Sequence, residues 1–233
     1  MIRLKEIKDS LLQLVFPHVC DGCGSDLLSE ESRLCLRCLA AMPETNFEKH
    51  PGNPVEKLFW GRLSLINATA QYYFTKESLM QRLMHQLKYR GNKELGLQLG
   101  RLMGIAINDA DRFNDIDALV PLPLFPSKEK RRGFNQATVL CNGMAEILAL
   151  PVLNNIVSRP QHTDTQTKKG RIDRWKNIEG KFFLTNASAI ENMHLLLVDD
   201  VITTGATLES CGSELLKAEN IRLSIATLCQ ASR

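Results

Sequence analysis

The segment that most constrains the fold of this chain is LLLVDDVITTGATL, which spans residues 195–208. Four apolar residues run directly into Asp199 and Asp200, and a loop of threonines with one glycine follows. A short apolar run bounded by polar residues is typical of a strand buried in a parallel sheet. The segment therefore predicts a strand, a tight loop and then a helix that begins at Ala206, as in an α/β domain.

The loop after this strand has the residue types of a phosphate site. A helix N-terminus presents free N–H groups and the positive end of the helix dipole. Gly205 allows the backbone to approach a ligand closely, and Thr203, Thr204 and Thr207 add hydroxyl donors. The two preceding aspartates would repel a phosphate, so we expect them to bind sugar hydroxyls or to hold Mg²⁺ through its waters. A ribose 5-phosphate has both groups; the alternative is a strand–turn–helix with acidic caps.

Strands and helices alternate along the rest of the larger part of the chain. Helical periodicity predicts helices over residues 78–89, 94–107, 134–148 and 206–217. Short apolar runs predict strands at residues 68–74, 117–121, 152–157, 182–184, 194–198 and 221–229. This alternation implies a parallel sheet with helices on both faces, whose ligand lies at the carboxyl ends of the strands. Three segments leave such ends as expected loops: 121–133, 158–177 and 199–205.

A basic segment, SKEKRRGFNQ, follows one of these strand ends. Arg131 and Arg132 directly precede a glycine and the start of a helix, and arginine suits bidentate contact with phosphate. We therefore expect both arginines to bind the ligand. For Lys128 and Lys130 a solvated charge run is the favoured interpretation. Lys88 ends an earlier helix and either reaches a phosphate or only complements the helix dipole.

A second basic segment extends from Arg159 to Asn177 and is long for a loop in a compact domain. One interpretation is a lid that excludes water from the reaction centre. The other is an exposed track for single-stranded nucleic acid, with Trp175 as a stacking surface. The net charge of +3 permits a nucleic-acid partner but does not require one.

The seven cysteines divide into two groups. The segment CDGCGSDLLSEESRLCLRC has the pattern CxxC-x11-CxxC, with Cys20, Cys23, Cys35 and Cys38 as thiols. Four such thiolates predict a closed, structural zinc ribbon, whose metal would supply folding energy to a small module. A redox dithiol is the alternative, and His18 is either a competing ligand or, as we favour, only a neighbour of the cluster. The remaining cysteines lie among apolar residues and are expected to be small buried side chains: Cys141, Cys211 and Cys229.

The module boundary is expected in the proline-rich segment 43–54. We therefore expect an N-terminal helix and zinc ribbon in residues 1–50 and an α/β domain in residues 55–233. No membrane span is visible, because the apolar segment 11–19 is short and follows mixed charges. Paired cysteines without a leader favour a cytoplasmic location.

Several motifs together resemble one known family across nearly the whole chain. These are the CxxC…CxxC ribbon, LKYRGN, VPLP, RRGFNQ, the T-x-x-Q segment at 163–166 and VDDVITTGAT. The combination resembles the ComF/GntX family, and the last motif resembles the phosphoribosyl-diphosphate (PRPP) motif of type I phosphoribosyltransferases. The resemblance implies a type I phosphoribosyltransferase-like domain behind a zinc module, and a link with natural competence. One departure is Lys168-Lys169-Gly170, which lies where the family often has an apolar residue.

The resemblance also assigns roles to residues. Asp199 and Asp200 would contact the ribose hydroxyls, and residues 203–207, including Ala206, would hold the 5-phosphate. Mg²⁺ would bridge the ribose hydroxyls and the pyrophosphate. With Arg132, the aspartates would form the catalytic set. Two hypotheses follow: a Mg²⁺-dependent transferase with an unknown acceptor, or a PRPP-responsive accessory protein that binds single-stranded DNA without turnover and contacts competence-machinery proteins.

Overall fold

The computed structural model of the chain describes residues 18–26, 32–160 and 182–231. Its centre is a parallel sheet of strands in the order β1-β6-β5-β2. The sheet strands are β1 (Ala68–Phe74), β2 (Ala118–Pro121), β5 (His194–Ile202) and β6 (Arg222–Ala231). A short antiparallel pair, β3 (Val157–Ser158) and β4 (Phe183–Leu184), lies outside this sheet.

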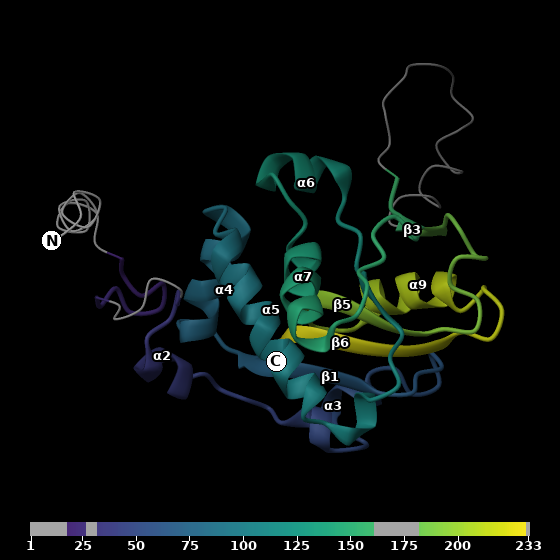
Figure 1. The fold of residues 1–233 in the computed structure, drawn as a ribbon, viewed down its shortest axis with the longest axis horizontal. Helices are drawn as coiled ribbons and strands as arrows, with labels where there is room; N and C mark the ends of the chain where they lie inside the picture. Colours follow the sequence, from purple (N-terminus) through teal and green to yellow (C-terminus); the bar gives the residue numbers. More distant parts are fainter. Residues whose placement is uncertain (1–17, 27–31, 161–181, 232–233) are drawn as a thin grey trace, which may run out of the picture.

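Helices fill the connections between the strands (Figure 1). They are α2 (Leu36–Ala40), α3 (Pro54–Lys57), α4 (Leu79–Tyr89), α5 (Lys93–Asn108), α6 (Pro126–Arg132), α7 (Gln136–Leu148) and α9 (Ala206–Leu215), with 3₁₀ turns η1 (Phe47–Lys49) and η2 (Asp111–Phe113). Side-chain caps define several helix starts. Ser78 accepts from the Gln81 amide at the start of α4, and Asn92 accepts from the Leu95 amide at the start of α5.

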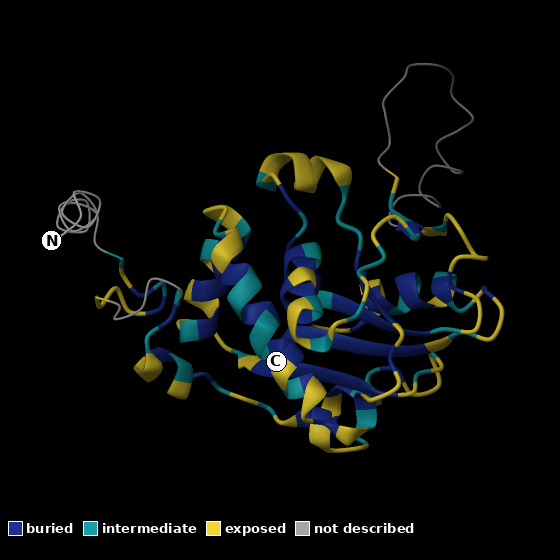
Figure 2. Cartoon of the chain, in the orientation of Figure 1, coloured by how far each residue is buried: buried dark blue, intermediate teal, exposed yellow. Residues whose placement is uncertain are grey.

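The two faces of the sheet are covered by different elements. In β5, Leu196 and Val198 pack in the cluster that contains the buried sides of α4, α5 and α7. Leu195 and Leu197 pack in the opposite cluster, with α9 and the segment around Phe59. Figure 2 shows the strands buried between these layers, whereas α6 is exposed. Successive strand residues therefore point to opposite layers, as the two-residue period of a strand requires.

Helices α5 and α7 lie side by side on the first of these faces (Figure 1). A Cβ atom on Gly100 would lie 2.3 Å from the Leu140 carbonyl oxygen, and one on Gly143 would lie 2.2 Å from the Leu97 carbonyl oxygen. The two backbones are therefore in direct contact, which only glycine at these positions permits.

The parallel α/β fold predicted from the sequence is confirmed, and the predicted helices at 78–89, 94–107 and 134–148 are present within a few residues. Three local predictions were wrong. The expected loop 121–133 contains α6, which begins with Pro126 in its first turn. The expected strand 152–157 is reduced to one bridge between Val152 and Leu119 and the start of β3.

The third difference concerns β5, which continues past Val198 to Ile202 instead of ending before the aspartates. It does so because β6 remains paired alongside it, with Asp199 opposite Thr227 and Ile202 opposite Gln230. Several interpretations lie outside the described residues: the apolar segment before residue 18, the T-x-x-Q segment, Lys168-Lys169-Gly170 and Trp175. Among the helices in the described part of the chain, none is long and apolar enough to cross a membrane.

Candidate functional site

The acidic pair lies near the carboxyl end of β5, where parallel α/β sheets place their ligands. Because Asp199 and Asp200 are both strand residues, their side chains leave opposite faces of the sheet. Asp200 lies on the α4 face, where its Oδ2 is 2.9 Å from Lys88 Nζ. Asp199 lies on the α9 face, and its Oδ1 accepts a 2.8 Å hydrogen bond from the Asp200 amide. From the sequence, both carboxylates were expected to face one ligand, and Lys88 was expected either to reach a phosphate or to complement the helix dipole.

The pKa of Asp199 responds to this placement. Burial, and then the neighbouring carboxylate of Asp200, raise the pKa of Asp199 to about 8. The amide of Asp200 and the cations Lys88 and Arg159 act in the opposite direction. The electrostatic cost of ionising Asp199 is therefore high without a further cation or hydrogen-bond donor.

The threonine–glycine loop turns directly into α9. Gly205 has φ of 77°, and a Cβ atom there would lie 2.9 Å from Phe59 Cε1. Arg62 contacts both the loop and the first turn of α9. Its Nη1 donates to the Thr204 carbonyl at 3.3 Å, and its Nη2 pairs with Glu209. Glycine is thus required by both the left-handed backbone and the ring behind it.

The same loop presents open hydrogen-bond donors. Thr203, Thr204 and Thr207 are exposed. Among the described residues, the amides of Thr203, Thr204, Gly205 and Thr207 have no hydrogen-bond partner. A small pocket of about 40 Å³ lies here, lined by Asp199 and residues 201–208. Free amides at a helix start are the donors that an oxyanion needs. The structure therefore brings the predicted phosphate-loop residues together at one corner.

Arg132 has defined contacts in the structure, whereas Arg131 is exposed on α6. Arg132 Nη1 donates to Gln136 at 2.5 Å, and its guanidinium lies 5.8 Å from the ring centre of Tyr89, next to Lys88 in α4. Its Nε is buried and has no partner among the described residues. Arg131 and Lys130 are exposed on α6, and Lys128 lies 5.9 Å from the ring of Phe125. Arg132 is thus the member of the basic segment with a fixed position.

Arg159 lies at the start of the basic segment that the sequence suggested was a lid or a nucleic-acid track, and the structure gives it a defined position. Its guanidinium carbon lies 3.8 Å from the ring centre of Phe125 and 4.8 Å from that of Phe182. Burial lowers the pKa of Arg159, and the charge of Asp199 acts against this shift. Its Nε is buried without a partner in the described part of the chain. No local pattern could identify it, because the rings that hold it are distant in sequence.

The four N-terminal cysteines come together as their spacing predicted. The sulfur atoms of Cys20, Cys23, Cys35 and Cys38 lie within 4.8 Å of one another, so the cluster can hold a metal ion. The Sγ atoms of Cys23 and Cys35 are 3.7 Å apart. Tetrahedral zinc with Zn–S bonds of about 2.3 Å would separate its sulfurs by about 3.8 Å. His18 Nε2 donates to the Ser32 carbonyl oxygen at 2.8 Å, and His18 is not part of the cluster.

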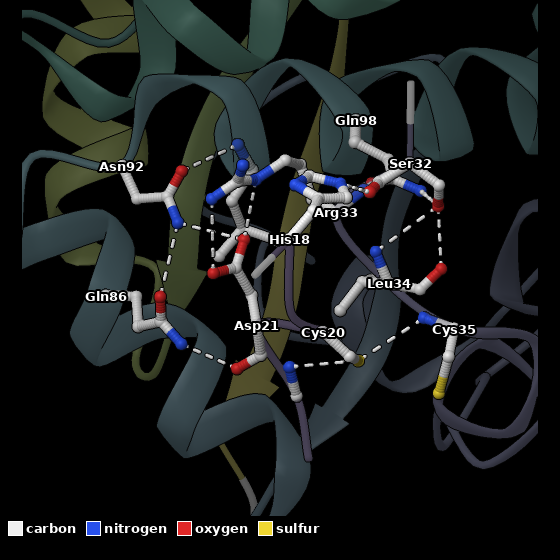
Figure 3. A network of polar contacts seen from close by, with 12 residues as sticks. His18, Cys20, Asp21, Ser32, Arg33, Leu34, Cys35, Gln86, Asn92 and Gln98 are labelled. Atoms are coloured by element: carbon white, nitrogen blue, oxygen red, sulfur yellow. Dashed lines mark hydrogen bonds and ion pairs between the residues drawn. The ribbon is translucent and has the colours of Figure 1, made fainter. Parts of the chain in front are cut away.

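The cysteine module is held against α4 and α5 by polar contacts (Figure 3). The carboxylate of Asp21 pairs with Arg33 at 2.9 Å and accepts from Asn92 Nδ2 at 2.9 Å. Gln86 Nε2 donates to the Asp21 carbonyl at 2.5 Å. Gln98 Oε1 accepts from the Arg33 amide at 2.7 Å. The module is therefore docked on the larger domain at the turn between α4 and α5.

The three other cysteines are buried, as the sequence indicated: Cys141, Cys211 and Cys229. Each thiol has its pKa raised by burial, which keeps it in the neutral form.

Comparison with known proteins agrees with this architecture. The family model for the phosphoribosyl transferase domain matches residues 134–233. Competence protein F of Haemophilus influenzae is 32% identical over 206 residues, which cover 87% of this chain and 80% of that protein. The DNA utilization protein YhgH of Escherichia coli K12 is 28% identical over 216 residues, with 91% and 90% covered. Competence protein ComFC of Bacillus subtilis is 29% identical over 161 residues, 67% of this chain and 61% of its own. The chain belongs to the competence protein F (ComF) family and carries its phosphoribosyl transferase domain.

Proposed function

We propose that this protein binds PRPP with Mg²⁺ at the carboxyl end of β5 and acts in DNA uptake or utilization. The observation that carries the proposal is the loop between β5 and α9, where free amides, threonine hydroxyls and Gly205 follow directly on two carboxylates. This order of groups complements a ligand with a phosphate at one end and a diol beside it. The names of the relatives support the cellular role.

Each part of PRPP has a matching group in the chain. The 5-phosphate would accept hydrogen bonds from the amides of residues 203–207 and from their hydroxyls. The ribose hydroxyls would donate to Asp199 or to Asp200. Because Asp200 is paired with Lys88, ligand binding would exchange this ion pair for a contact with the ligand. Arg132 and Arg159, each with a buried Nε free of partners among the described residues, would face the pyrophosphate.

The donor set also fits a magnesium ion. Mg²⁺ prefers carboxylate oxygens, waters and substrate phosphates, and this corner offers the carboxylate of Asp199 beside the proposed anion site. When bound, the ion would neutralise charge on the departing pyrophosphate. The protein itself would hold the ribose by its phosphate and hydroxyls, and its arginines would stabilise the leaving group.

If transfer occurs, it is a displacement at C1 of the ribose. The bond between C1 and the pyrophosphate oxygen breaks, pyrophosphate leaves with the electron pair, and an acceptor nucleophile bonds to C1 and loses a proton. The described residues identify neither a general base for this proton nor a base-specific acceptor pocket at this corner. We therefore leave the acceptor open.

For the cysteine cluster we propose structural zinc. The four sulfurs lie within 4.8 Å of one another, the 3.7 Å between Cys23 Sγ and Cys35 Sγ matches a tetrahedral site, and Cys20 and Cys38 are buried. Two amides, of Gly22 and Cys35, donate to Cys20 Sγ at 3.4 and 3.3 Å. Such donors stabilise thiolate ligands around a metal.

Calorimetric titration with PRPP and Mg²⁺ tests the proposal. We expect saturable binding that Asp200→Asn weakens at least about tenfold through loss of an ionic acceptor. Arg159→Ala should weaken PRPP binding and leave ribose 5-phosphate binding nearly unchanged, because the latter lacks the pyrophosphate. Arg131→Ala, which removes an exposed arginine from α6, is the matched control. Absence of PRPP binding by the zinc-loaded protein would refute the proposal.

The second candidate function is a PRPP-responsive accessory protein without turnover. The Lys88–Asp200 ion pair favours it, because a ligand that releases Lys88 changes the end of α4 without any chemical step. Release of pyrophosphate from PRPP, assayed with nucleobases and with single-stranded DNA as acceptors, separates the two. Turnover supports the transferase, and PRPP binding without turnover supports the accessory protein.

A further inference from the structure

A cavity separate from the proposed PRPP corner lies at the seam between the cysteine module and α4. Its volume is about 450 Å³, and it is open to solvent. The lining residues, which we call the α4 groove, are Asp21, Gln81, Arg82, His85, Gln86 and Arg90. All but Asp21 come from α4 or from the residue after its end. The cavity exists because the module docks beside this helix.

The charge of the α4 groove is positive. Asp21 contributes the one carboxylate, and that group is already paired with Arg33 and with the amide of Asn92. The side chain of Arg82 makes one contact, from Nε to the Gly22 carbonyl at 3.3 Å, and its remaining donors have no partner among the described residues. Arg90 has no side-chain partner in the same part of the chain. Both guanidinium groups are exposed and available to an anion.

Aromatic rings continue the same exposed side of the helix. His85 and Tyr89 are stacked at a tilt, with ring centres 5.1 Å apart. Tyr89 is 63% exposed, so much of its ring surface is open to a partner molecule. The guanidinium carbon of Arg132 lies 5.8 Å from the ring centre of Tyr89. Cationic and aromatic side chains therefore lie together along the exposed side of α4.

We propose that the α4 groove and Tyr89 bind single-stranded DNA. Arginines would contact successive phosphates, and the His85–Tyr89 pair would stack on a base. A duplex would fit less well, because its bases are already stacked and cannot cover Tyr89. The inference rests on the DNA-related role proposed above, and it places DNA outside the basic segment 159–177.

The position of the α4 groove gives the proposal a second consequence. Asp21 and Gly22 lie between two of the metal ligands, Cys20 and Cys23, and both residues contact α4 side chains. One wall of the groove is therefore part of the metal module. We expect the zinc-loaded protein to bind DNA more tightly than the metal-free protein.

Fluorescence anisotropy of a labelled oligo(dT) strand with the full-length, zinc-loaded protein tests the proposal. The double variant Arg82→Ala/Arg90→Ala should weaken binding at least about tenfold in 150 mM salt. Loss of two phosphate contacts should also reduce the slope of log K against log salt by about 1.4. The Arg82→Lys/Arg90→Lys variant keeps both charges and should retain most of the wild-type slope. A retained slope would show that substitution at these two positions does not by itself unfold the protein.

The matched control removes the same charge from another surface. Lys49→Ala/Lys57→Ala removes two exposed lysines from η1 and α3, on the side of the sheet opposite α4, and should leave binding within about twofold. Tyr89→Leu should weaken binding roughly tenfold, whereas Tyr89→Phe keeps the ring and should not. Equal effects of the two charge variants, or equal affinity for duplex DNA, would overturn the proposal.

The proposal of DNA binding in the α4 groove and the proposal of PRPP binding at β5 can be refuted independently. The Arg82→Ala/Arg90→Ala variant should titrate with PRPP as the wild type does, since neither arginine lies at the carboxyl end of β5. Loss of DNA binding with intact PRPP binding supports the α4 groove. Wild-type protein that binds oligo(dT) through this groove but not PRPP would refute the proposed function alone.

Discussion

Replacing Gly205 with alanine tests the loop on which the proposed PRPP site depends. Two costs add at this position. An L-residue at a φ of 77° costs roughly 1–2 kcal/mol. The new methyl would also lie 2.9 Å from Phe59 Cε1, and because Phe59 is only 1% exposed its ring cannot move into solvent. Overpacking of this kind costs roughly 1–3 kcal/mol, so the expected loss is roughly 2–5 kcal/mol in the free energy of unfolding.

Gly52→Ala is the control for the backbone part of this cost. Gly52 has a similar φ of 68°, but a Cβ atom there would meet no atom within 4 Å. We therefore expect a loss of only roughly 1–2 kcal/mol. Urea denaturation with unchanged m-values measures both variants. In a double-mutant cycle, Phe59→Leu should partly relieve Gly205→Ala, so that the two losses are less than additive by about 1 kcal/mol.

Three outcomes would refute this reasoning. Equal losses for Gly205→Ala and Gly52→Ala would show that the Phe59 ring does not limit the loop. Additive losses in the cycle would show the same. A Gly205→Ala protein that binds PRPP with wild-type affinity would show that the position of these amides does not matter for the ligand.

Further predictions concern the acidic pair and the metal. The side chains of Lys88 and Asp200 are 21% and 14% exposed, between fully exposed and fully buried pairs. A double-mutant cycle of Lys88→Met with Asp200→Asn should therefore give a coupling energy of roughly 1–2 kcal/mol. A coupling near zero would show that the pair does not form in solution. Because the pKa of Asp199 is raised in the folded protein, the folded state binds more protons than the unfolded state between about pH 4, the unfolded pKa, and about pH 8. The free energy of unfolding should therefore fall as pH rises through this window. Asp199→Asn should remove this fall in denaturation curves measured from pH 5 to 8. Metal analysis should find one zinc per chain, and Cys35→Ser should release it and lower Tm; full zinc content in that variant would contradict a four-thiolate site.

The predictable parts of this structure are those whose cause is local in sequence. An apolar run followed by hydroxyls and glycine specifies a strand, the loop after it and the start of α9 within one short segment. The cysteine cluster was predictable for a related reason, since two CxxC pairs bring a fixed set of thiols within reach of one another. The parallel order of strands followed from alternation with helices.

The parts that could not be predicted depend on contacts between distant segments. Arg159 is held by Phe125 and Phe182, which are separated from it by 34 and 23 residues in the sequence. No periodicity records such a contact. The length of β5 depended in the same way on its pairing with β6, and this pairing sends Asp199 and Asp200 to opposite faces.

The opposite directions of the two carboxylates have a consequence for the whole molecule. Asp200 contacts Lys88 near the end of α4, and the next residues of the chain, Tyr89 and Arg90, belong to the proposed DNA surface. A ligand that competes for Asp200 would therefore act on a helix that also binds DNA. Linkage requires the effect to be reciprocal: the factor by which PRPP changes DNA affinity must equal the factor by which DNA changes PRPP affinity. We expect Lys88→Met to bring both factors close to one. If both factors differ from one in the wild type and are unchanged in that variant, the coupling does not pass through this ion pair.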